Sequence, residues 1–223
     1  EETGTAFRNG LVMATCYAIP ISFLGWFYSG SIATFFIKDE LATPLTTQYV
    51  SIVFLGLLFS SYSFVFQGFY TGIEKTKIHM RVTVTSNVLN VYLNAGLIYG
   101  TRGVQEFFVE NFPNIQQVSL LWRWVEFPAL GVEGAAIATL ISSVWMTIHY
   151  SLHLFSNKIR TDYSVLHFSI DKKMMVRQIK LAAPQGVQET IIAFGWGVFY
   201  KIVGTIGLLE LATTELLFTI MHT

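Results

Sequence analysis

Long stretches without a charged side chain dominate this sequence. Four of them, each 20 to 29 residues long, cover residues 11–37, 45–73, 82–101 and 134–157. A fifth stretch, 181–209, is apolar except for Glu189 and Lys201. An α-helix needs about 20 mainly apolar residues to cross the ~30 Å hydrocarbon core of a bilayer. The pattern therefore predicts five transmembrane helices, with the start of a sixth near Glu210.

The composition agrees with this interpretation and excludes several classes of protein. Hydrophobic residues make up 52% of the 223 residues and charged residues only 13%, about half the charged fraction of a typical soluble domain. The 14 basic residues are balanced by 14 acidic ones, so the chain has no basic excess with which to bind nucleic acid. A disulfide framework is excluded because Cys16 is the only cysteine. The expected fold class is an all-α, polytopic integral membrane protein.

The distribution of lysine and arginine predicts how the helices are oriented. If the N-terminus is cytoplasmic, the inside segments 1–10, 74–81 and 158–180 carry ten basic residues, whereas the outside loops carry three. Basic residues favour the cytoplasmic side in short loops. We therefore expect residues 158–180 to be cytoplasmic and the protein to be a multi-pass component of the inner (plasma) membrane.

The same pattern divides the chain into parts. Residues 1–157 form an N-terminal lobe of four transmembrane helices, 158–180 a charged cytoplasmic linker, and 181–223 the start of a second lobe. Within the first lobe, the segment at about 102–130 is long for a loop and rich in aromatic residues. We expect an external hairpin or interfacial helix anchored by Trp122 and Trp124, because amphipathic rings favour the headgroup level. The alternative is a lid over an outward-facing cavity.

The two ends of the sequence suggest that it belongs to a longer protein. The chain begins at Glu1 rather than at a methionine, and it ends within the apolar run LLFTIMHT. We therefore expect further helices of the same protein to pack against those seen here.

Small residues and prolines indicate where helices touch or bend. Gly96 and Gly100 form a G-x-x-x-G pattern, and Gly134 and Ala138 are spaced in the same way, as in close contacts between membrane helices. Proline disrupts a helix interior, so kinks or breaks are expected at Pro20 and in the sequence Pro184-Gln185-Gly186. The second of these draws attention to Gln185, because discontinuous helices recur at transporter binding sites.

Four motifs in order resemble the multidrug and toxic compound extrusion (MATE) family of transporters. They are FQGFYTGIEKTKIHMR (66–81), SNVLNVYLNAGLIYG (86–100), LGVEGAAIATLIS (130–142) and KLAAPQGVQETIIAFGWGVFYKIVGTIGLLELA (180–212). The resemblance implies helices three to eight of a fold with twelve helices in two six-helix lobes around a central cavity. It also implies export of cationic or amphipathic compounds in exchange for Na⁺ or H⁺, with no other cofactor and no metal site.

Polar residues in the apolar stretches are the candidate binding residues. Asn87, Asn90 and Asn94 lie in the third stretch, and the last two share a helical face because they are four residues apart. They could make hydrogen bonds between helices, worth roughly 0.6 kcal/mol each. They could instead support a cation site, which the resemblance favours, because members of the family carry Asn or Asp at the positions of Asn90 and Asn94.

Glu189 is the only carboxylate well inside an apolar stretch. A charge at the centre of a membrane helix costs about 2.5–3.5 kcal/mol, and such residues are usually functional. Many MATE proteins carry a glutamate in this helix, about one turn further on, near Ile192 here. Glu189 is therefore either a cation or proton site that lines a cavity or a structural partner of another helix.

Two other classes of membrane protein are alternatives to a drug-efflux transporter. A lipid-linked oligosaccharide flippase has a similar fold, but its cavity should be richer in basic residues than this chain, which offers only Lys201 there. A membrane enzyme would need clustered polar residues at one depth on several helices, and a non-transporting subunit is a further possibility. An efflux transporter fits best, with membrane lipids and a small cationic or amphipathic substrate as expected partners.

Overall fold

The computed structural model describes residues 2–37, 39–163, 165 and 170–221. Within these residues every regular element is helical, in agreement with the predicted fold class. The elements are α1 (Glu2–Phe27), α2 (Ser29–Phe36), α3 (Ala42–Gly72), α4 (Thr76–Asn111), the 3-10 helix η1 (Pro113–Trp122), α5 (Val132–Leu154), α6 (Asn157–Asp162), α7 (Lys172–Ile206) and α8 (Leu208–Met221).

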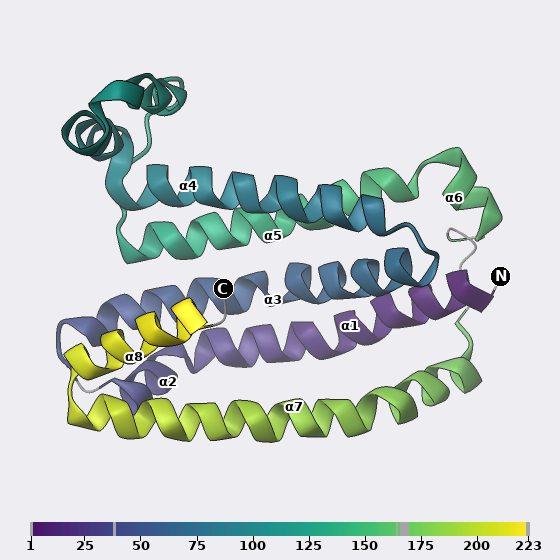
Figure 1. Cartoon of the computed structure of the whole chain (residues 1–223). Helices are drawn as coiled ribbons and strands as arrows, with labels where there is room; N and C mark the ends of the chain where they lie inside the picture. Colours follow the sequence, from purple (N-terminus) through teal and green to yellow (C-terminus); the bar gives the residue numbers. More distant parts are fainter. Residues whose placement is uncertain (1, 38, 164, 166–169, 222–223) are drawn as a thin grey trace.

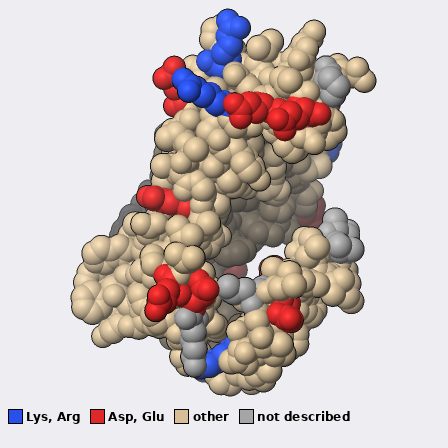
Figure 2. All heavy atoms as spheres, turned by 90° about the vertical axis from the view of Figure 1, so that its left-hand side faces the viewer, with Lys and Arg blue, Asp and Glu red and all other residues tan. Residues whose placement is uncertain are grey.

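The long helices lie side by side in the order α4, α5, α3, α1, α7 (Figure 1). Helices α3 and α5 form the centre of this row, and α7 contacts the rest of the chain only through α1, α2 and α8 in the described residues. Seen from the end at which α2 joins α3, the molecule is hollowed between the part formed by α4 and η1 and the part formed by α2, α7 and α8 (Figure 2).

Four helices meet the length and apolarity expected of membrane spans, namely α1, α3, α5 and α7. The third predicted span, 82–101, is also helical and lies within α4, which runs beside α5. The structure thus confirms a polytopic helical membrane protein. Among the five predicted spans, the one in α4 is the least apolar, because it contains the three asparagines.

The segments with the ten basic residues lie at one end of the row. The N-terminus, the turn from α3 to α4 and helix α6 share that end, and η1, α2 and the junction of α7 with α8 share the other (Figure 1). The helices are therefore connected as the sequence predicted, with alternating loops on opposite sides.

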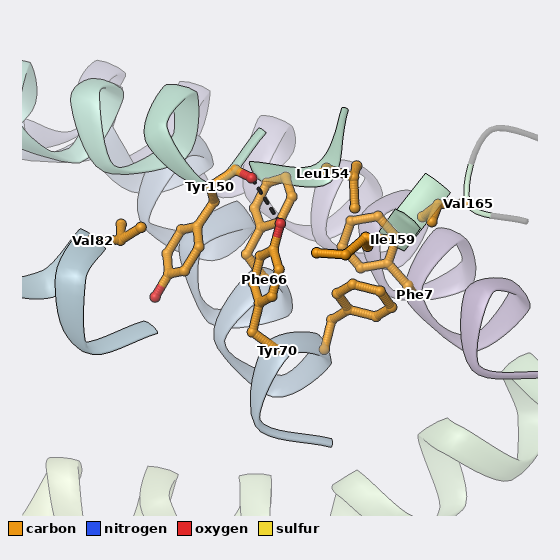
Figure 3. Packing of buried hydrophobic residues seen from close by; sticks show 9 residues of the cluster. Phe7, Phe66, Tyr70, Val82, Tyr150, Leu154, Ile159 and Val165 are labelled. Atoms are coloured by element: carbon orange, nitrogen blue, oxygen red, sulfur yellow. Dashed lines mark hydrogen bonds between the residues drawn. The ribbon is translucent and has the colours of Figure 1, made fainter. Parts of the chain in front are cut away.

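An aromatic cluster holds α1, α3, α4 and α5 together near the end that carries α6. Phe66 and Tyr150 stack with ring centroids 5.4 Å apart, and the Tyr70 hydroxyl donates a hydrogen bond of 2.9 Å to the Tyr150 carbonyl oxygen (Figure 3). Phe7 joins from α1 and Val82 from α4. Because the surrounding lipid is as apolar as these side chains, tight packing and hydrogen bonds rather than hydrophobic burial stabilise the contact in a membrane.

Helix α7 is attached to α1 by polar contacts at its beginning. Asp171 caps α7 by accepting from the backbone N–H groups of Lys173 and Met174. The buried Asn9 side chain donates to the Asp171 carbonyl oxygen at 2.9 Å, and Gln178 donates to the Ala6 carbonyl oxygen at 3.0 Å. These bonds join the predicted linker, 158–180, to the first lobe at the end that carries the basic segments. The proposed boundaries of the two lobes at 157 and 181 remain predictions.

The helix contacts predicted from small residues divide into two kinds. Gly134 and Ala138 do pack between helices, because Gly134 lies against the Leu97 carbonyl and Ala138 joins Leu93 and Leu97 in a buried cluster. Gly96 instead lies against the rings of Phe127 and Trp122, which belong to the segment between α4 and α5. The second G-x-x-x-G position, Gly100, adopts a left-handed backbone conformation with φ of 73° and ends the straight part of α4.

Replacement of Gly134 by alanine should destabilise the protein. A Cβ atom at this position would overlap the backbone carbonyl oxygen of Leu97, so α4 and α5 would have to separate. Overpacking of this kind typically costs 1–3 kcal/mol, and we expect a lower unfolding midpoint in detergent.

Gly68→Ala is the matched control for this test. A Cβ atom there has nothing within 4 Å, and alanine is favoured over glycine in a helix by about 1 kcal/mol. Equal midpoints for the two variants would contradict the close α4–α5 contact.

Candidate functional site

The candidate site lies on α4, where two asparagine side chains bond to each other. The Asn94 Nδ2 atom donates to Asn90 Oδ1 at 2.9 Å. Both side chains are half-buried, at the border of the α4 face that packs on α5, whereas Asn87 is exposed. The predicted shared face of Asn90 and Asn94 is therefore confirmed, and their role in binding stays a prediction.

Each asparagine keeps hydrogen-bonding capacity beyond the bond that joins them. An amide offers two donor hydrogens and an oxygen with two lone pairs. The bond uses one donor of Asn94 and one lone pair of Asn90, so the Asn94 oxygen can still coordinate a cation or accept a hydrogen bond. Hard cations prefer such oxygen ligands.

Two buried serines near the asparagines were missed by sequence reasoning. Ser86 lies one turn before Asn90 on α4, and Ser142 lies on α5. Both hydroxyl groups are buried without a hydrogen-bond partner among the described residues. By contrast, Thr139 and Ser143 on α5 donate to the carbonyl four residues earlier. The missed signal was a serine on the same helical face as Asn90, at a spacing of four residues.

The half of α4 that carries Asn94 is held by the segment between α4 and α5. The Trp122 indole nitrogen donates to the Tyr92 carbonyl oxygen at 2.9 Å, and the two rings stack with centroids 5.0 Å apart. The Tyr92 hydroxyl donates to the Leu121 carbonyl oxygen at 3.0 Å. Trp122 therefore anchors the segment to α4, whereas Trp124 is 90% exposed. The anchoring of either ring at the headgroup level stays a prediction.

The break at Gly100 is compensated by the chain that returns to α5. In an uninterrupted helix the carbonyls of residues 97 and 98 would accept from the N–H groups four residues later. Here they accept from the backbone of Leu130 at 2.8 Å and of Gly131 at 3.2 Å. Unsatisfied backbone groups are costly in a membrane, so this pairing allows the straight part of α4 to be interrupted at Gly100, six residues after Asn94.

The discontinuous helix thus lies in a different place from the one predicted. Helix α7 continues as one element through Pro184, Gln185 and Gly186, so the break expected there does not occur. Proline at this site lacks one backbone hydrogen bond without ending the helix. The interrupted helix is α4, and the glycine that ends it had been interpreted as a helix-packing residue.

Glu189 and Gln185 lie on α7 and are both exposed. In the described part of the chain α4 and α7 make no contact, so the structure does not bring these two residues together with Asn90 and Asn94. The candidate residues form two separate groups, one on each of the two outermost helices of the row. No group of three or more His, Cys, Asp or Glu side chains in the described residues could hold a metal ion.

A family model named MatE matches residues 1–95 of this chain. This region includes α1, α3 and the part of α4 that carries the asparagine pair. The chain is related to the MATE family. This is the family that the four motifs resemble, and all of α5 and α7 lie beyond the matched region.

Curated relatives cover more of the chain at low identity. A probable multidrug resistance protein NorM from Photorhabdus laumondii is 26% identical over 82% of this chain and 35% of its own length. NorM from Bacillus anthracis is 26% identical over 90% of this chain and 38% of its own length. The probable multidrug resistance protein YoeA from Bacillus subtilis is 24% identical over 74% of the chain and 32% of its own length.

The chain thus spans little more than a third of the length of the relatives that it matches. No solved structure matches it significantly. These relatives agree with a membrane transporter rather than with an enzyme, and they locate the candidate residues in a multi-pass membrane protein.

Proposed function

We propose that this chain is part of a secondary-active efflux transporter that exchanges cationic or amphipathic compounds for H⁺ or Na⁺. The observation that carries this proposal is the bonded pair of Asn90 and Asn94 on the interrupted helix α4 of a MATE-related chain. Polar side chains are expensive in a membrane helix and mark ion or substrate pathways. The relatives are named as multidrug resistance proteins, which supports the same function.

The two groups of candidate residues suit an exchange mechanism. Asn90 and Asn94 offer neutral oxygen ligands on α4, in the first predicted lobe, and Glu189 offers a carboxylate on α7, in the second. A carboxylate can hold a proton, a sodium ion or a cationic substrate. Because one occupant disfavours another, binding of the ion on one side of the membrane would help to release the substrate.

A transport assay with the full-length protein tests this function. The protein would be reconstituted in vesicles, and uptake of a fluorescent cation would be followed under an imposed pH or Na⁺ gradient. We expect uptake that requires one of the two gradients and stops when it is dissipated. Uptake of lipid-linked oligosaccharide instead, without dependence on either gradient, would support the flippase alternative.

We further propose that residues 158–180 face the cytoplasm of a cell whose inner membrane holds the protein. Lys173 is exposed in the first turn of α7, and Glu106 is exposed at the opposite end of the row. In the full-length protein, Lys173→Cys should react with a membrane-impermeant maleimide only after the cells are opened. Glu106→Cys should react in intact cells, and the reverse pattern would refute the orientation.

A further inference from the structure

A groove lies between α2 and the second half of α7, away from the asparagine pair. Its volume is about 500 Å³, within the ~300–1,000 Å³ typical of small-molecule sites. Phe35 and Phe36 of α2 form one wall, and Phe194, Val198 and Ile202 of α7 form much of the other. The groove is therefore almost entirely apolar.

Two glycines of α7 allow the end of α2 to come close. A Cβ atom on Gly204 would lie 3.5 Å from the Phe36 carbonyl oxygen, and one on Gly197 would lie 3.9 Å from the Phe36 ring. Larger side chains at these positions would fill the space between the helices. The groove is thus a consequence of the α7 sequence and joins the first half of the chain to the second.

Lys201 is the one ionisable residue among the described residues that line the groove. Its side chain is half-buried, and its Nζ atom lies 3.2 Å from the centre of the Phe35 ring. An aromatic ring attracts a cation that lies above its face. The Phe35 ring therefore holds the Lys201 amine at the groove. The nearby carboxylate of Glu215, on α8, is hydrogen-bonded to Tyr200, the residue that precedes Lys201 on α7.

The acid within the same helix is too far away to neutralise this lysine. Glu189 precedes Lys201 by twelve residues, which is about 18 Å along an α-helix. The groove therefore combines an apolar slot with one positive charge and no carboxylate in its lining. Its charge complements an anion and repels the cationic compounds of the proposed efflux function.

The position of Lys201 along α7 places the amine near the membrane surface. The helix ends at Ile206, five residues or about 7.5 Å further on. Lysine side chains near helix ends extend towards the interface, where lipid phosphates lie. The apolar part of the groove continues from Lys201 back to Ala193, towards the interior of the bilayer.

We propose that this groove binds an anionic phospholipid of the surrounding membrane. One acyl chain occupies the slot between α2 and α7, and the phosphate of the headgroup pairs with Lys201. The positive charge of Lys201 favours an anionic lipid over a cationic export substrate, and the position of its amine near the membrane surface places it at the level of the lipid phosphates. A lysine near a membrane surface attracts anionic headgroups.

The test uses the purified full-length protein and measures retained lipid by native mass spectrometry. The protein would be incubated with phosphatidylglycerol or with phosphatidylcholine of the same acyl chains. We expect preferential retention of phosphatidylglycerol, reduced about fivefold in Lys201→Gln, the change expected for one lysine near a membrane surface. Lys201→Arg should retain the preference, because it keeps the positive charge.

Lys180→Gln is the matched control, since Lys180 is an exposed lysine of the same helix outside the groove. It should bind phosphatidylglycerol as the unmodified protein does. Equal retention of the two lipids, or unchanged retention in Lys201→Gln, would overturn the proposal. Displacement of the bound lipid by an exported cation would also overturn it and would assign the groove to the transport substrate.

The lipid test is independent of the transport test. Retention of lipid requires no ion gradient and no transport cycle, so it can succeed when export fails. Size-exclusion chromatography of Lys201→Gln and Lys201→Arg would show whether each variant is folded. A folded Lys201→Arg protein without any preference for phosphatidylglycerol would refute the proposed pairing with the amine.

Discussion

Glu189→Gln in the full-length protein should abolish ion-coupled export while leaving expression near normal. Glutamine has almost the same shape as glutamate, but it cannot exchange a proton or carry the negative charge that holds Na⁺ or a cationic substrate. A charge at the centre of a membrane helix costs about 2.5–3.5 kcal/mol, so its removal should not impair insertion. Gradient-driven uptake of a fluorescent cation into proteoliposomes would measure the effect.

The exposure of Glu189 in the structure makes it available to an ion or to a partner helix. If a partner helix were its only role, glutamine would replace it with little loss, because an amide can still accept a hydrogen bond. Glu106→Gln is the matched control, since Glu106 is also exposed but lies outside the long apolar stretches. Full uptake with unaltered ion dependence in Glu189→Gln would move the coupling site elsewhere, most plausibly to the asparagine pair.

Asn94→Leu should impair export much more than it impairs folding. The substitution removes the hydrogen bond to Asn90, and bonds of this kind in membrane proteins average only about 0.6 kcal/mol. It also removes the amide oxygen that remains available to a cation. Loss of a residue that supports a cation site typically weakens affinity by 10- to 100-fold. Na⁺ or H⁺ dependence of uptake would reveal such a shift.

A change at the exposed neighbour separates the two roles of the asparagine pair. Asn87→Leu, on the same helix but outside the Asn90–Asn94 bond, should leave uptake largely intact. Asn94→Leu should shift the unfolding midpoint less than Gly134→Ala does, when each variant is compared with the unmodified protein. Unchanged export in Asn94→Leu would leave the pair with a structural role alone.

Much of the architecture was set by the local pattern of the chain. Uncharged stretches of about 20 residues can satisfy their backbone groups in a bilayer only as helices, so the helical class and most of the spans followed directly. The order of the spans, together with the excess of basic residues in alternate loops, predicted which loops share an end, and a four-residue spacing brought Asn90 next to Asn94. The small residues Gly134 and Ala138 similarly marked the contact between α4 and α5.

Other features depended on contacts between residues far apart in the chain. Pro184 does not end α7, whereas Gly100 ends the straight part of α4 because Leu130 and Gly131 supply replacement hydrogen bonds. Trp122 packs on Tyr92, whereas Trp124 is 90% exposed, and no local pattern distinguishes the two tryptophans. The sequence alone determined a MATE-like set of membrane helices and its polar candidates. Only the tertiary structure decided where the helix breaks, that the candidates form two separate groups, and that Lys201 faces an aromatic groove, because each depends on long-range packing.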